Sequence, residues 1–274
     1  MSNAMRMLKT RMLGIWNIRS LIGNLVQSEL RSGVARRKFG LLWWLLDPIL
    51  LLGIYWVLVV VVLDVRRNVD EPYPLFLFSG LLFWKWFSTS ISRGGSSLVG
   101  RAHLIKSISV PKVAFPISIV LASCIPWALG TFILSGLSLA FGRPIFSLNL
   151  LQSLPLLFVS FVTLASGAII MSVVTVYFRD LAGLTPHVLR AGYYLSPGLW
   201  SLEMLSERLP DVAHTVYLWL NPVALLMSCW RRITFSGASI SLEDWGVVCA
   251  QCLILFISSI LVFDRYDQDV ARHL

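Results

Sequence analysis

Charged side chains are scarce in this sequence. Asp, Glu, Lys and Arg make up only 14% of its 274 residues, whereas 57% of the residues are hydrophobic and the mean hydropathy is +0.76. An ordinary soluble domain has about 25% charged residues and about 45–50% apolar ones. The composition therefore excludes a typical soluble globular protein and predicts an integral membrane protein.

Residues suited to metal or redox chemistry are also few. The chain has four histidines and four cysteines, and each cysteine lies in or beside an apolar run with no histidine nearby. The Cys249-x-x-Cys252 spacing alone is weak evidence for a redox or metal centre. We therefore interpret the cysteines as small buried hydrophobic residues and predict no metal site.

A phosphate-binding loop of the form G-x-x-x-x-G-K-[ST] is absent from the sequence, so we do not expect the chain to hydrolyse ATP by itself. Two adjacent acidic pairs, Asp70–Glu71 and Glu243–Asp244, stand at predicted span ends with no adjacent histidine. We interpret them as solvated caps, whereas a membrane glycosyltransferase would need an acid–base pair or a metal at an aqueous face. The chain is therefore predicted not to be an enzyme, and no catalytic residue is assigned.

The sequence is instead dominated by long apolar runs. About 20 apolar residues at 1.5 Å per residue cross the ~30 Å hydrocarbon core. One run, 215–230, is interrupted at Asn221 and Pro222, where proline removes a hydrogen-bond donor. It predicts a re-entrant hairpin within an extracytoplasmic segment, 203–235. Six other runs are predicted spans: 41–63, 73–92, 113–141, 151–177, 185–202 and 245–263.

Basic residues in the connecting segments predict the orientation. Eight Lys or Arg and one acid precede the first span, the next segment has two basic and three acidic residues, and the one after that has four basic and none acidic. This alternation predicts a cytoplasmic N-terminus and, with six spans, a cytoplasmic C-terminus. Anionic lipid headgroups account for the net charge of +9 without a nucleic-acid partner.

The N-terminal segment has a pattern of its own. Residues 1–4 resemble a cloning scar, and no cleaved signal peptide is predicted after them. Within residues 5–39, apolar side chains from Met7 to Val26 share one helical arc and polar ones lie opposite. This pattern predicts an interfacial helix, which either anchors the chain or also contacts a partner. Residues 40–274 are predicted to form a single six-span transmembrane domain.

The cytoplasmic loop 93–110 contains a second amphipathic pattern. Gly94 and Gly95 are expected to end the preceding helix, and Ser96 or Ser97 to cap a new one. The loop is interpreted either as a docking site for a soluble partner or as an ordinary basic loop. Two faces are predicted for its short helix: Leu98, Leu104 and Ile105 on one, and Arg101, His103 and Lys106 on the other.

Five stretches of the sequence carry a family resemblance. In order they are SGVARRKFGLLWWLLDPILLL, LIKSISVPKVAFPIS, VVTVYFRDLAGL, YYLSPGLW and LNPVALL. They resemble the permease subunits of polysaccharide ABC exporters, a type 2 ABC permease family that moves O-antigen, capsular and teichoic-acid polymers. The most specific piece is the motif formed by Phe178, Arg179, Asp180 and Leu181.

The resemblance implies a homodimer of permeases in the bacterial inner membrane, together with two copies of a separately encoded ATPase that carries the ATP and Mg. No cofactor is expected in this chain. The implied substrate is a polyprenyl-diphosphate-linked polysaccharide, with a drug or lipid exporter, or a membrane glycosyltransferase, as alternatives. The interfacial helix and the loop helix would face the ATPase, with these coupling residues: Leu98, Arg101, His103, Leu104 and Lys106.

Such a substrate needs cations at the cytoplasmic entrance and aromatic faces farther along. The entrance cations are predicted to be Arg36, Arg37 and Lys38, for which the positive-inside rule is an alternative explanation. The family places the first and fifth spans around the conduit, although an aromatic belt at the headgroups explains aromatic side chains equally well. The predicted conduit residues are Trp43, Trp44, Tyr55, Trp56, Tyr193, Tyr194 and Trp200.

Two further features complete the predicted path. Asn221 and Pro222 are predicted to form the turn of an outer gate, with Arg231 and Arg232 at the external headgroup level. The alternative is a surface amphipathic hairpin with no gating role. Asp47, the one carboxylate in the first span, precedes Pro48 and is expected at a broken or kinked helix start. Its candidate partners are Arg36, Arg37 and Arg179.

Overall fold

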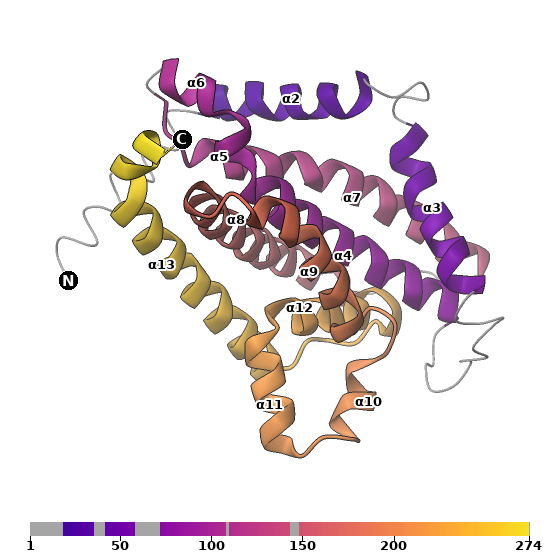
Figure 1. Cartoon of the computed structure of the whole chain (residues 1–274). Coiled ribbons are helices and arrows are strands. Elements are labelled where there is room, and N and C mark those ends of the chain that lie inside the picture. The colour runs from indigo at the N-terminus through magenta and orange to yellow at the C-terminus, as the bar shows by residue number, and fades with distance from the viewer. Residues whose placement is uncertain (1–18, 36–41, 58–71, 108–109, 143–147, 274) are drawn as a thin grey trace.

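The computed structural model describes residues 19–35, 42–57, 72–107, 110–142 and 148–273, and all regular structure in these ranges is helical (Figure 1). The apolar runs predict an all-α integral membrane protein, and the all-α class is confirmed for these residues. The main helices of the bundle are α3 (Leu42–Trp56), α4 (Tyr73–Gly95), α7 (Ala114–Ala140), α8 (Ser153–Tyr177), α9 (Leu181–Leu195) and α13 (Leu242–His273).

Three helices are long and apolar enough to cross a membrane: Ala114–Ala140, Asn149–Tyr177 and Leu242–Asp267. The number rises to four if the bent pair of Asp211–Leu220 and Pro222–Ser236 counts as one span. The described part of the chain is thus a multi-pass membrane protein with three or four candidate spans.

The other predicted spans are also helical but shorter or more polar. Helix α9 has 15 residues, which cover only ~22 Å, and α4 carries Lys85 and Arg93. The predicted span 41–63 is described only over residues 42–57, which are helical. The predicted span 185–202 is wrong at its C-terminal end, because α9 stops at Leu195, two residues before Pro197. The count of six spans remains a prediction.

The centre of the bundle is formed by α4, α7, α8 and α13. Helix α4 packs against α7 and α8, and α8 packs along α13. A small side chain makes the approach of α4 to α8 close: a Cβ on Gly94 would lie 2.7 Å from the Cβ of Ala168. Small residues at such contacts let helix backbones approach closely where lipid replaces water.

One end of the bundle carries the elements of the predicted ATPase-facing side. There α2 (Arg19–Ala35) packs along α7, near α5 (Ser97–Gly100) and α6 (Ala102–Ser107) (Figure 1). Ile22 and Leu25, both on the predicted apolar arc, are buried in a cluster with Leu98 and Phe115. The interfacial helix predicted over 5–39 is therefore helical over residues 19–35, and its other residues lie outside the described ranges.

The opposite end carries a broken pair of helices (Figure 1). Helix α12 is buried from Val223 to Arg231, whereas no residue of α11 is buried. Their axes meet at 97° across Asn221, so the predicted helix break at Asn221 and Pro222 is confirmed. The elements at this end are α10 (Leu202–Ser206), α11 (Asp211–Leu220), α12 (Pro222–Arg231) and η3 (Arg232–Ser236). The short helix η2 (Leu148–Gln152) contacts η3.

Candidate functional site

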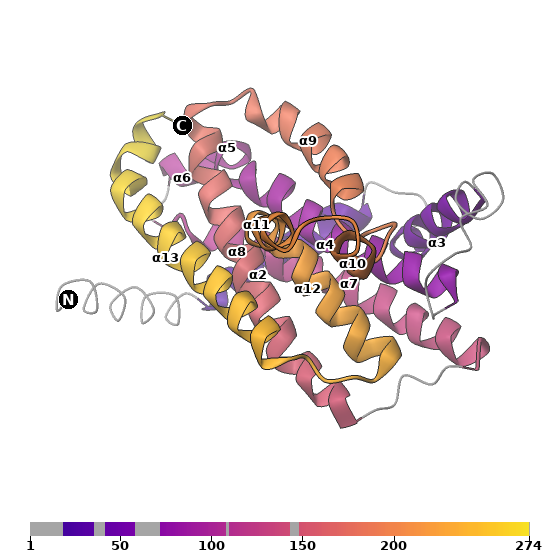
Figure 2. The ribbon, with the colours of Figure 1, turned by 90° about the horizontal axis from the view of Figure 1, so that it is seen from below.

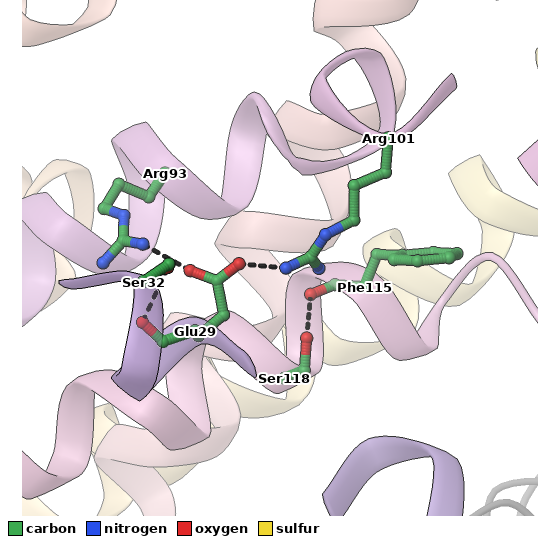
Figure 3. A network of polar contacts seen from close by, with 6 residues as sticks. All are labelled: Glu29, Ser32, Arg93, Arg101, Phe115 and Ser118. Atoms are coloured by element: carbon green, nitrogen blue, oxygen red, sulfur yellow. Dashed lines mark hydrogen bonds and ion pairs between the residues drawn. The ribbon is translucent and has the colours of Figure 1, made fainter. Parts of the chain in front are cut away.

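A carboxylate on helix α2 connects it to the loop predicted to contact the ATPase. Arg93, at the C-terminal end of α4, donates to Oε2 of Glu29, and Arg101, between α5 and α6, donates to Oε1 (Figure 3). The Glu29 side chain is 10% exposed and that of Arg101 is 19% exposed. Water and salt screen such a shielded pair less than a surface pair. Three separate elements are thus held by one carboxylate.

The sequence prediction missed Glu29. Its two arginine partners are 64 and 72 residues away, and no local pattern reveals such a pairing. One signal was present, because Glu29 is the single acid among eight basic residues before the first span. The guanidinium of Arg101 also lies 5.6 Å from the centre of the Phe115 ring, which places an aromatic face against the same cation.

Helix α6 exposes a different face from the one predicted. Leu98 and Ile105 are buried, as expected of the apolar side, but Leu104 is 38% exposed beside exposed His103 and Lys106. The placement of Leu104 on the inner side and of Arg101 on the free side is therefore wrong. The reason is local: α5 ends at Gly100 and α6 begins at Ala102, so one helical arc does not run through both. Coupling to an ATPase through this face remains a prediction.

The motif from Phe178 to Leu181 forms the turn between α8 and α9, closed by the Leu181 amide donating to the Phe178 carbonyl at 3.1 Å. Arg179 donates to the carbonyl of His273 at 3.0 Å. The motif therefore lies beside the C-terminal end of α13. Phe178 and Asp180 are exposed there.

Asp47 lies within helix α3, after the predicted entrance cations. The side chain of Asp47 and residues 36–38 lie outside the described part of the chain, so their pairing remains a prediction. The backbone does settle one point, since α3 continues through Asp47 and Pro48 to Trp56. A broken helix start is therefore wrong, whereas a kink at Pro48 stays a prediction.

The predicted conduit aromatics differ in their surroundings. Tyr193 is 4% exposed, with its ring 5.8 Å from that of Trp84, so in the single chain it is a core residue. Tyr194 is 50% exposed, and its carbonyl accepts a hydrogen bond from the Trp200 indole at 3.2 Å. Trp56 is 42% exposed and Trp43 half-buried, whereas the side chains of Trp44 and Tyr55 lie outside the description. Their role as a conduit remains a prediction.

The corner between α11 and α12 is tied down by side chains. The Asn221 side chain accepts from the Ala224 amide at 3.2 Å, capping α12, and donates to Ser196 Oγ at 2.8 Å. Pro222 has no amide hydrogen, so the Leu218 carbonyl loses its usual helical partner. Gln251 of α13 replaces it by donating to that carbonyl at 2.7 Å. The corner is therefore joined to the end of α9 and to α13.

Arg231 is buried at the inner end of the hairpin. Its guanidinium donates to the carbonyls of Phe76 at 3.0 Å, Gly198 at 2.9 Å and Pro197, and to Ser79 Oγ at 3.1 Å. It also lies 3.6 Å from the centre of the Phe76 ring. The side chain thereby connects α12 to α4 and to the loop after α9.

The prediction that placed Arg231 at the external headgroups is wrong. Helix α12 is buried from Val223 to Arg231, and Arg231 lies on the side that reaches α4 and the loop after α9. Arg232 takes the outer position and pairs with Asp244 at 2.6 Å. Gly80 leaves the room that the inner arginine needs, because a Cβ on Gly80 would collide with the Arg231 guanidinium.

The described residues hold no group of three or more His, Cys, Asp or Glu side chains arranged for a metal ion. Of the four cysteines, Cys229 is buried and Cys249 is exposed. The interpretation of the cysteines as buried hydrophobic residues is therefore confirmed for Cys229 and wrong for Cys249 in the single chain.

Comparison with known proteins gives relatives of the whole chain. No protein-family model matches the sequence. An O-antigen export system permease protein, RfbA, from Myxococcus xanthus is 28% identical over 261 residues, which are 95% of this chain and 97% of that protein. Two proteins of the same name from Klebsiella pneumoniae are 26% and 23% identical, over 91% of this chain and 93% of each. The similarity therefore includes both ends of the bundle.

Proposed function

The chain is a permease of the polysaccharide ABC exporter family, and on this premise we propose that it forms the membrane path of an ATP-driven exporter. Its substrate is a polyprenyl-diphosphate-linked cell-surface polysaccharide, which it moves outward across the bacterial inner membrane. It works as a homodimer with two copies of a separate ATPase at the cytoplasmic face. Both of its termini lie on that side.

The observation that carries this proposal is the similarity to O-antigen export permeases over nearly the full length of each protein. The two ends of the bundle give the proposal a physical basis. Helices α2, α5 and α6 gather at one end, where α6 exposes His103, Leu104 and Lys106 to a soluble partner. The broken pair α11 and α12 lies at the other end, where a seal against leakage is needed.

Deletion of the gene tests the proposal. We expect surface polysaccharide to disappear and lipid-linked polymer to accumulate on the cytoplasmic side, with both effects reversed when the gene is restored. Co-purification of the permease with an ATPase in mild detergent is the matching biochemical result. Normal surface polysaccharide in the deletion strain would exclude this substrate and favour an exporter of drugs or other lipids.

A further inference from the structure

Helix α9 contacts the bundle with one face and leaves the other free. Thr185, Leu189, Gly192 and Tyr193 form the inner, less exposed row, and a Cβ on Gly192 would lie 3.2 Å from the Trp84 ring of α4. Figure 2 shows α9 at the margin of the molecule. The outer face is therefore available to lipid, to a second copy or to a substrate.

This outer face has two chemically different flanks. Leu184, Val188 and Leu195 are each more than half exposed and form an apolar flank. His187, Arg190 and Tyr194 follow the spacing i, i+3, i+7, so at 100° per residue they fall within an arc of about 60°. His187 and Arg190 are exposed, and Tyr194 is 50% exposed. An apolar strip thus runs beside a cationic and aromatic one.

The cationic flank is unsuited to lipid tails. Cations within membrane segments are costly, and they face water, a partner group or a substrate path. Helix α9 has no acidic residue, and among the described residues neither His187 nor Arg190 has an acidic side chain within ion-pairing distance. The described residues therefore leave this flank open to an external anion.

We propose that the outer face of α9 binds the diphosphate of the lipid-linked glycan, with Arg190 and His187 on the phosphate oxygens. This inference rests on the proposed function and assigns residues to its substrate. Arginine suits the role because its planar donors match phosphate oxygens in pairs. The polyprenyl tail lies along the flank of Leu184 and Val188.

The order of the side chains matches the order of groups in the substrate. His187 and Arg190 are about 9 and 13 Å along the helix from Leu181, at the cytoplasmic end of α9, and Tyr194 lies about 6 Å farther. A glycan that moves sugar first presents its first sugar to the Tyr194 ring while the diphosphate rests on Arg190. The Tyr194 ring is then a stacking surface for the sugar next to the diphosphate.

The test uses the permease–ATPase complex in phosphatidylcholine nanodiscs and undecaprenyl diphosphate as the probe. We expect Arg190→Gln to weaken probe binding about tenfold, the loss of one charge-assisted hydrogen bond. Arg190→Lys should recover only part of the affinity, because it keeps the cation but loses the paired planar donors. The matched control is Arg208→Gln, which removes an exposed arginine between α10 and α11 and should bind like wild type.

Four other outcomes would overturn the proposed diphosphate site, each for a different reason. Equal binding by wild type and Arg190→Gln overturns the site but leaves the exporter intact, whereas no binding by wild type overturns the lipid-linked substrate itself. Competition by phosphatidylglycerol at equal concentration would make this a site for bilayer lipid, and a monomeric Arg190→Gln variant would make it a subunit interface. If Arg190→Gln fails to accumulate, His187→Gln tests the same flank, with a loss of about threefold expected.

Discussion

Arg231 is a cation surrounded by neutral oxygen atoms, and this arrangement makes it sensitive to substitution. Three backbone carbonyls and one hydroxyl accept its hydrogen bonds, from two segments that are far apart in the sequence. Removing the guanidinium leaves buried acceptors without donors, which costs more than the hydrogen bonds themselves contribute. A lysine cannot replace it, since a single ammonium does not reach four acceptors in different directions.

We expect Arg231→Met to lower the free energy of unfolding by about 2–4 kcal/mol, from the unsatisfied carbonyls and the lost contact with Phe76. Tryptophan fluorescence during thermal unfolding in detergent would measure it, because Trp230 is buried next to the site. The neighbouring Arg232→Met is the control. It removes a half-exposed pair with Asp244 and should cost less than about 1 kcal/mol. Similar losses for the two variants would contradict the role assigned to Arg231.

At the scale of elements, Glu29 determines how α2 and the loop between α4 and α7 sit relative to each other. Its carboxylate, on α2, pairs with both Arg93 and Arg101. Glu29→Gln keeps the shape but removes the charge. We expect amide exchange in residues 97–107 to rise roughly tenfold, because the pair contributes about 1–2 kcal/mol to holding that loop.

Hydrogen exchange followed by mass spectrometry gives the readout for Glu29→Gln, with ATP consumed per exported polymer as a functional measure. Glu207→Gln is the control, since Glu207 is exposed at the opposite end of the bundle. Unchanged exchange over residues 97–107 in Glu29→Gln would show that the contacts of Leu98 and Ile105 alone hold the loop.

Helix α6 should contact the ATPase through its exposed face. The double variant Leu104→Ala with Lys106→Ala removes one apolar and one cationic contact, and we expect at least a tenfold loss of ATPase co-purification from about 1.4 kcal/mol or more of lost binding. The control removes the same two kinds of side chain at the other end, Val212→Ala with Arg208→Ala. Both variants should remain folded, and equal retention of the ATPase by both would place the docking surface elsewhere.

The pair α11 and α12 is expected to stay on the outer side of the membrane as a re-entrant hairpin. Leu220 is 80% exposed beside the corner, and substituting it leaves the Asn221 hydrogen bonds in place. In a background without the four native cysteines, Leu220→Cys should react with a membrane-impermeant maleimide from outside only. Leu104→Cys, at the opposite end, should react from the cytoplasmic side only. Labelling of Leu220→Cys from the cytoplasmic side would show that the pair crosses the membrane.

At the scale of the whole molecule, local sequence patterns predicted the elements but not the contacts between them. Apolar runs predicted helices, and a proline after Asn221 predicted the corner, because both effects depend on neighbouring residues. Pairs such as Glu29 with Arg101 depend on how distant helices pack. Arg231 was placed outside for the same reason: its sequence neighbours resemble a headgroup flank, and only the packing of α12 against α4 turns it inward.

Helix α13 touches both ends of the molecule. In its first third, Gln251 supplies the donor that Pro222 lacks, and near its C-terminal end Asp267 accepts from Lys112 at 3.2 Å. Sixteen residues of unbroken helix separate these two points, a rod of about 24 Å. Because the helix is unbroken between them, the contact with Lys112 and the contact with the α11–α12 corner cannot move independently. Any tilt of α13 therefore shifts the two ends of the bundle together.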